Sequence, residues 1–95
     1  MKVQINNQKS FWITWKYSEE LNPLTFATTR VTTCKIVDDS IQGSPFPIAS
    51  GTSRCHENDR FVKEAGRKLS LARAIRSLNI PKSERKIIWE TYLNR

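Results

Sequence analysis

Few side chains in this sequence are suited to acid–base or metal chemistry. It has a single histidine, His56, which stands beside Cys55, one of only two cysteines; the other is Cys34. Neighbouring residues rarely share a metal ion, and zinc would need two further ligands. Adjacent residues also seldom form a nucleophile–base pair. We therefore expect no structural metal, no cofactor and no enzymatic activity from these residues.

Two other catalytic signatures are missing. The three glycines are isolated, so the chain has no glycine-rich phosphate loop. Asp38 and Asp39 are adjacent at a turn, where short polar side chains are common. A metal-dependent hydrolase built on this pair would need a third acid, for which Glu57 and Asp59 are the nearest candidates. That arrangement is the remaining enzymatic alternative.

The sequence also lacks a signal peptide and any long apolar run. We therefore expect a soluble, intracellular protein with no membrane partner. In such a compartment both cysteines are expected to be reduced thiols.

Basic residues outnumber acidic ones, 16 to 9, and the formal net charge is +7. Most of this excess lies after Arg54, in the second half of the chain. Such an imbalance predicts attraction to anions: nucleic acid, nucleotides or an acidic protein. The alternative is that the charges only solvate helix surfaces.

Hydrophobic periodicity predicts an α+β domain. Strand patterns, rich in β-branched and aromatic residues, precede helical ones. The expected strands cover 2–5, 11–17, 24–37 and 48–55. A helix is expected over 59–78, capped by Asn58 and Asp59 and ended by Asn79 and Pro81, and a second helix begins at Pro81. The order predicts one domain, 1–95, with an antiparallel sheet of four strands in 1–55 covered by two helices in 56–95.

The first predicted helix carries a wide apolar arc that we expect to be buried: Phe61, Val62, Ala65, Leu69, Ala72, Leu71, Ile75 and Leu78. Lys68 and Arg76 point over this arc, so they must reach outward or meet an anion. Gly66 and Ser70, four residues apart, allow another backbone to approach, and we favour packing over ligand binding as their role.

Candidate ligand residues come mainly from this basic helix. Arginine suits phosphate because its planar fork donates two parallel hydrogen bonds. Aromatic side chains could stack on bases. Arg30, in the middle of a threonine-rich strand, is either exposed or directed at a ligand. The predicted ligand-binding residues are Trp12, Arg30, Arg60, Phe61, Arg67, Arg73 and Arg76.

Three partners remain open from the residues alone: a small phosphate-bearing nucleotide, long DNA or RNA, or a host protein bound through the basic face. A domain of this size often gains stability by association, so a homo-oligomer is also expected.

Residues 55–74 (CHENDRFVKEAGRKLSLARA), followed by 81–85 (PKSER) and 88–92 (IWETY), resemble small phage-encoded proteins. The order of sheet and helices is similar to that of the anti-Thoeris sponge family, which captures cyclic ADP-ribose signals. The resemblance implies a non-enzymatic oligomer that binds a small cyclic nucleotide between subunits in the host cytoplasm. It would thereby blunt host immune signalling. The resemblance assigns no individual ligand residue.

Overall fold

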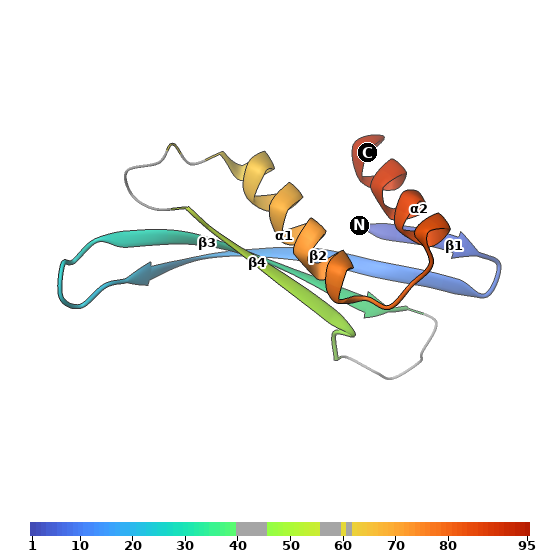
Figure 1. The fold of residues 1–95 in the computed structure, drawn as a ribbon, viewed down its shortest axis with the longest axis horizontal. Helices are drawn as coiled ribbons and strands as arrows, with labels where there is room; N and C mark the ends of the chain where they lie inside the picture. Colours follow the sequence, from blue (N-terminus) through green and yellow to red (C-terminus); the bar gives the residue numbers. More distant parts are fainter. Residues whose placement is uncertain (40–45, 56–59, 61) are drawn as a thin grey trace.

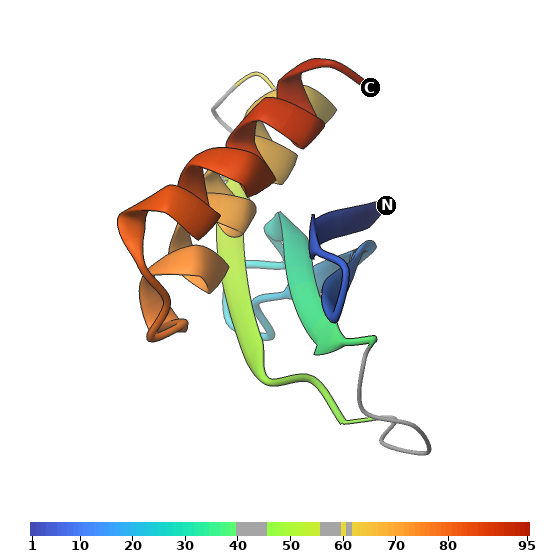
Figure 2. The same cartoon turned by 90° about the vertical axis from the view of Figure 1, so that its right-hand side faces the viewer.

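The computed structural model describes residues 1–39, 46–55, 60 and 62–95. The predicted fold class is confirmed: four antiparallel strands precede two helices on one side of the sheet (Figures 1 and 2). The sheet order is β1-β2-β3-β4, which matches the chain order. The elements are β1 (Lys2–Asn6), β2 (Lys9–Leu21), β3 (Thr28–Asp38), β4 (Ala49–Cys55), α1 (Lys63–Ser77) and α2 (Lys82–Leu93).

The β2–β3 hairpin is longer than predicted. Ser18–Leu21, expected to connect two strands, continues β2 and pairs with the beginning of β3. Glu19 lies opposite Arg30 and forms an ion pair with it at 3.8 Å, so cross-strand pairing outweighs the low strand propensity of glutamate. The third strand begins at Thr28 instead of residue 24 because Pro23 and Leu24 form the turn.

The alternation of apolar residues in 11–17 predicts that Phe11 and Ile13 share the core-facing side of the sheet, and this is confirmed. Phe11 and Ile13 of β2 lie in the core with Cys34 and Ile36 of β3. Trp12, on the other face, is 46% exposed. The helices contact only the first face, so the second face is open within the described residues. We call it the open face.

The prediction for α1 is wrong at its start and only partly right about its buried face, where Leu71 and Ile75 are buried as expected. The helix begins at Lys63 with Val62 as its N-cap, four residues later than predicted, while Asn58 and Asp59 lie outside the described residues. Leu69 and Val62, expected in the core, are 44% and 47% exposed. The residues of α1 that are buried are Ser70, Leu71, Ala74 and Ile75.

Small side chains explain why the buried face of α1 is rotated away from the predicted one. Gly66, Ser70 and Ala74 follow one another at intervals of four, so they form a ridge along α1. A Cβ atom on Gly51 of β4 would lie 2.2 Å from the Ser70 carbonyl oxygen, and one on Gly66 would lie 2.7 Å from Thr32 Oγ1. The helix therefore rests on the sheet through its small residues, as favoured for Gly66 and Ser70.

Lys68 and Arg76 consequently do not lie over a buried surface: both are exposed. Asn79, which was expected to end the helix, does not have a left-handed backbone. The C-cap of α1 is Leu78, whose backbone is extended and whose N–H donates to the Ile75 carbonyl at 3.0 Å.

The second helix contacts the sheet through large side chains. Ile88 and Tyr92 are fully buried, and the Tyr92 ring lies 5.7 Å from that of Trp15. At its N-terminal end, Glu84 pairs with Lys9 of β2 at 2.7 Å. These contacts fix α2 above β1 and β2.

Candidate functional site

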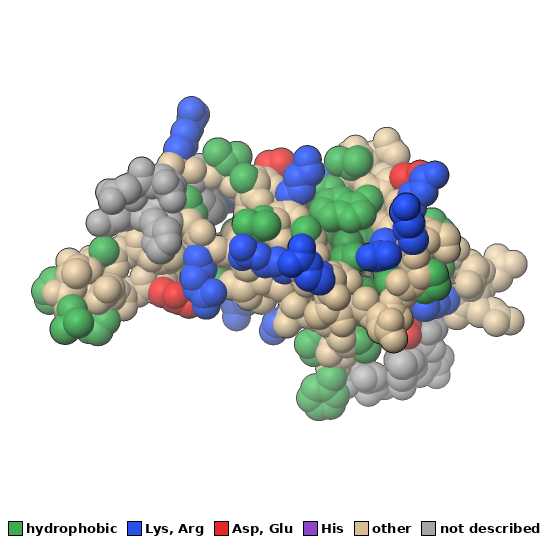
Figure 3. All heavy atoms as spheres, viewed as in Figure 1, with side chains coloured by type: hydrophobic (Ala, Val, Ile, Leu, Met, Phe, Trp, Pro, Cys, Tyr) green, Lys and Arg blue, Asp and Glu red, His purple; other side chains and the backbone are tan. Residues whose placement is uncertain are grey.

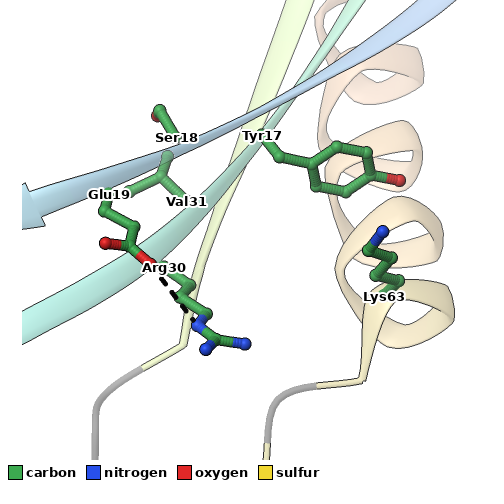
Figure 4. A pocket seen from close by; sticks show the side chains of 6 residues that line it. All are labelled: Tyr17, Ser18, Glu19, Arg30, Val31 and Lys63. Carbon is green, nitrogen blue, oxygen red and sulfur yellow. Dashed lines mark ion pairs between the residues drawn. The ribbon is translucent and has the colours of Figure 1, made fainter.

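A pocket of about 290 Å³ opens between the β2–β3 hairpin and the first turn of α1 (Figure 4). Arg30 comes from β3, Lys63 from α1 and Tyr17 from β2. The Tyr17 ring points toward α1, and the Lys63 ammonium lies 5.3 Å from the centre of that ring. An aromatic face and two cations therefore border one hollow.

The strand register explains how these side chains meet. Tyr17 is on the helix-facing side of β2, because it continues the alternation of Phe11, Ile13 and Trp15. Its hydroxyl accepts a hydrogen bond from Arg67 Nε at 2.7 Å, which ties the strand to α1. The backbone carbonyl of Arg67 in turn accepts from Trp15 Nε1 at 3.2 Å.

A second pocket, of about 180 Å³, adjoins the first at Arg30. Arg60 and the hydroxyl-bearing Thr32 and Ser53 line it, together with Gly66 of α1. We call the two pockets together the arginine groove. Apolar side chains, among them Val62 and Leu69, also line it, and one wall is the N-terminal end of a helix whose first N–H groups lack an intrahelical partner.

Positive charge dominates this groove. Glu19 is the only acidic residue among the described lining residues, and Arg30 engages it. Arg60 makes no hydrogen bond or ion pair with another described residue. The N-cap Val62 supplies no side-chain hydrogen bond to the helix. The groove therefore combines cations with a helix N-terminus, an arrangement that favours anions.

The structure brings together only some of the predicted ligand residues. Arg30 and Arg60 line the groove, and Arg67 is hydrogen-bonded to Tyr17 at its edge. Arg73 donates to the Thr52 carbonyl of β4 at 2.6 Å, while Arg76 is exposed in the last turn of α1.

Trp12 lies on the open face, on the opposite side of the sheet from the groove. Phe61 lies outside the described residues. The proposed stacking side chains are therefore not placed in the groove.

The ligand residues predicted from the sequence did not include Lys63, Tyr17 or Glu19. The alternation of β2 placed Tyr17 on the covered face, which was the available signal. The late start of α1 leaves Tyr17 beside a helix end instead of under a helix, and no local pattern indicated that.

The cysteines and clusters of metal-binding side chains are the other groups of chemical interest among the described residues. Both cysteines are free thiols, and burial raises the pKa of Cys34 to about 12, so it is a poor nucleophile at neutral pH. No group of three or more His, Cys, Asp or Glu residues within the described part of the chain is placed to hold a metal ion. His56, Glu57 and Asp59 lie outside it.

None of the described helices is long and apolar enough to span a membrane. Comparisons with family models, curated proteins and solved structures find no match to this chain.

Proposed function

We propose that this protein binds a small phosphate-bearing nucleotide in the arginine groove and sequesters it without cleaving it. The observation that carries the proposal is the set of cations around one hollow beside an exposed aromatic ring: Arg30, Arg60 and Lys63 near Tyr17. A cyclic nucleotide or a cyclic ADP-ribose isomer has the matching parts, a base to stack and phosphate oxygens to accept hydrogen bonds.

Each part of the groove has a role in this proposal. The base stacks on the Tyr17 ring, which the Arg67 hydrogen bond holds in place. Lys63 and Arg60 bind phosphate oxygens, and the free N–H groups at the start of α1 add further donors. Arg30 exchanges part of its contact with Glu19 for the ligand.

The dimensions suit a compact ligand. Small-molecule sites in proteins measure about 300–1,000 Å³. The larger pocket, of about 290 Å³, stands at the lower limit, and the adjoining pocket of about 180 Å³ extends it. A single nucleotide fits this range, whereas a nucleic acid duplex needs a long exposed surface.

We extend the proposal to a biological role, supported by the resemblance of residues 55–74 to small phage-encoded proteins and by an order of sheet and helices similar to that of anti-Thoeris sponges. A phage-type protein in the host cytoplasm would hold the cyclic nucleotide signal and so blunt immune signalling. No catalytic group is required, because sequestration needs only affinity and abundance.

Calorimetry against cyclic nucleotides and ADP-ribose isomers, with a short DNA duplex alongside, tests the binding. Lys63→Glu should weaken binding by about a hundredfold, because it replaces a phosphate contact by a repulsive charge. Arg85→Glu is the matched control: it makes the same change of charge on α2, away from the groove. It should change affinity less than about threefold.

Salt and recovery of the ligand complete the test. Raising the salt concentration from about 50 to about 200 mM should lower the affinity for a ligand in the pocket by less than about tenfold. The affinity for a duplex should fall by roughly a thousandfold or more. Chromatography after denaturing the complex should return the ligand unchanged. Binding of the duplex alone, or a cleaved ligand, would refute sequestration.

Binding of nucleic acid on the open face is a second candidate, supported by Trp12. Its side chain is 46% exposed opposite Val37, and Lys35 and Lys16 lie further along the same face without an ion pair to another described residue. Aromatic side chains among cations are typical of single-strand binding surfaces. Trp12→Ala should abolish this mode and leave nucleotide binding in the groove unchanged.

A further inference from the structure

The outer edge of β2 is unpaired over Trp15–Leu21 among the described residues. β1 pairs with β2 only as far as Trp12, and Met1 then closes the ladder by exchanging two backbone hydrogen bonds with Ile13. Beyond that point the hairpin extends away from the helices (Figure 1). A long free edge is a template for another strand.

The free hydrogen-bonding groups of this edge can be assigned. Residues of a strand direct their N–H and C=O groups alternately to its two sides. Ile13 directs both toward β1, and the pairing of β2 with β3 runs without a register shift to Leu21. Hence Trp15, Tyr17, Glu19 and Leu21 present unpaired groups outward.

A second copy of the chain can satisfy all of these groups. An antiparallel pair of β2 strands with its two-fold axis at Ser18 places Trp15 opposite Leu21 and Tyr17 opposite Glu19, each twice by symmetry. The same residue contacts recur on both subunits, as an isologous interface requires. The ladder ends at Ile13, where Met1 already occupies the edge, and at Pro23, which has no N–H to donate.

Side-chain chemistry selects this register. It sets Lys16 of one subunit opposite Glu20 of the other on the open face, where opposite charges stabilise a cross-strand pair. Moving the axis to Glu19 would put the two Glu19 side chains opposite each other, and moving it to Tyr17 would leave Lys16 opposite Ser18. Only the Ser18 axis is complementary in charge and uses the full free edge.

Exposed apolar surface near this edge agrees with the pairing. Leu21 is 60% exposed, and hydrophobic side chains gather at the hairpin end of the molecule (Figure 3). In the proposed register each Leu21 lies beside the partner's Trp15 on the helix-facing side, which removes part of this surface from water.

We propose that the protein forms a two-fold dimer by pairing β2 with β2 around Ser18, which joins the two sheets into one. The two bodies then lie at opposite ends of the overlapping hairpins. This dimer does not depend on nucleotide binding in the arginine groove. It also brings the two arginine grooves together, because Tyr17, Ser18 and Glu19 line the groove and lie in the interface.

Sedimentation velocity over a range of concentrations tests the dimer, and Glu19→Pro is the first variant. Proline removes an N–H that is free in the subunit but bonded in the dimer, and edge strands accept proline at such positions. The dissociation constant should rise by about a hundredfold or more, with the circular dichroism spectrum unchanged. Lys35→Glu, on β3 and away from the edge, should leave the dimer intact.

Charge reversal tests the register itself. Lys16→Glu sets two acids opposite each other, and Glu20→Lys sets two lysines opposite each other, so each variant alone should dimerise about tenfold more weakly or worse. Mixed together, the two variants regain opposite charges at both positions and should form a heterodimer.

A wild-type chain that stays monomeric at high concentration would overturn the proposal. So would a dimer that Glu19→Pro does not weaken, or variants that fail to recover on mixing. Glu20 also contacts Arg54 within its own subunit at 3.4 Å, so thermal denaturation of each variant should be compared with that of the wild type. Recovery on mixing distinguishes an intersubunit effect from a loss of fold.

Discussion

The two helices reach the same face of the sheet by opposite means. α1 approaches through Gly66, Ser70 and Ala74, so closely that Gly51 has no space for a Cβ atom. α2 contacts the core through large, fully buried side chains, above all Tyr92. Adding an atom should therefore disrupt the contact of α1 with the sheet, and removing atoms should disrupt the contact of α2.

Adding one methyl group at Gly51 should have the largest effect. In Gly51→Ala the new Cβ would lie 2.2 Å from the Ser70 carbonyl oxygen and 2.4 Å from the Ala74 nitrogen. Both are backbone atoms, so α1 must shift as a whole. Urea denaturation should show a loss of more than about 3 kcal/mol in the free energy of unfolding.

The neighbouring Ser50→Ala is the control for this substitution. Ser50 is exposed on the open face, so removing its hydroxyl should change the free energy of unfolding by less than about 0.5 kcal/mol. A Gly51→Ala protein as stable as the wild type would show that α1 does not approach β4 this closely.

Removing atoms from α2 should have the next largest effect. Ile88 is fully buried in the core, so Ile88→Ala leaves a cavity and should lower the free energy of unfolding by about 3 kcal/mol. Ile88→Val should lose about 1 kcal/mol by the same measurement. Equal losses for both variants would mean that the site collapses around the smaller side chain.

The contrast between the helices also explains which parts of the fold the sequence predicts. In β2 large apolar residues alternate, and Phe11 and Ile13 are buried as expected. In α1 the apolar residues indicate the buried face only in part: Leu71 and Ile75 are buried as expected, whereas Val62 and Leu69 are exposed. The distance between α1 and β4 decides which other residues of the helix face the sheet. Gly51 lets the helix approach so closely that only small residues fit at the contact, and the spacing of large apolar residues contains no information about this distance.

The candidate site was only partly predictable for a related reason. Arg30 and Arg60 were selected for their charge, and the fold places both in the groove. Tyr17 required knowledge of where α1 begins, and the extension of β2 beyond it depended on pairing with β3. These are long-range effects, and a local pattern contains no information about them.

The smallest effect is expected where the helices join. Tyr92 Oη donates to Glu64 Oε1 at 2.7 Å, and Arg95 contacts the other carboxylate oxygen at 3.0 Å. The hydrogen bond from Tyr92 is the main cause that holds the pKa of Glu64 below its usual value. Burial, followed by the hydrogen bond to Glu64, raises the pKa of Tyr92 to about 12.

These shifts give Tyr92→Phe a distinctive pH dependence. The lowered pKa of Glu64 stabilises the fold at pH values above 4.5, the ordinary pKa of a glutamate. This contribution is lost as the pH falls through the lower pKa of the folded state. A raised tyrosine pKa stabilises the fold below pH 10, and this contribution is lost between pH 10 and about 12. The excess of the wild-type melting temperature over that of Tyr92→Phe should thus be greatest between these limits. When Tyr92→Phe is compared with Tyr92 in a Glu64→Gln background, the difference in melting temperature should no longer fall at acid pH, but it should still fall at alkaline pH. If the difference still fell at acid pH, the Glu64 carboxylate would not be the group that couples α1 to α2.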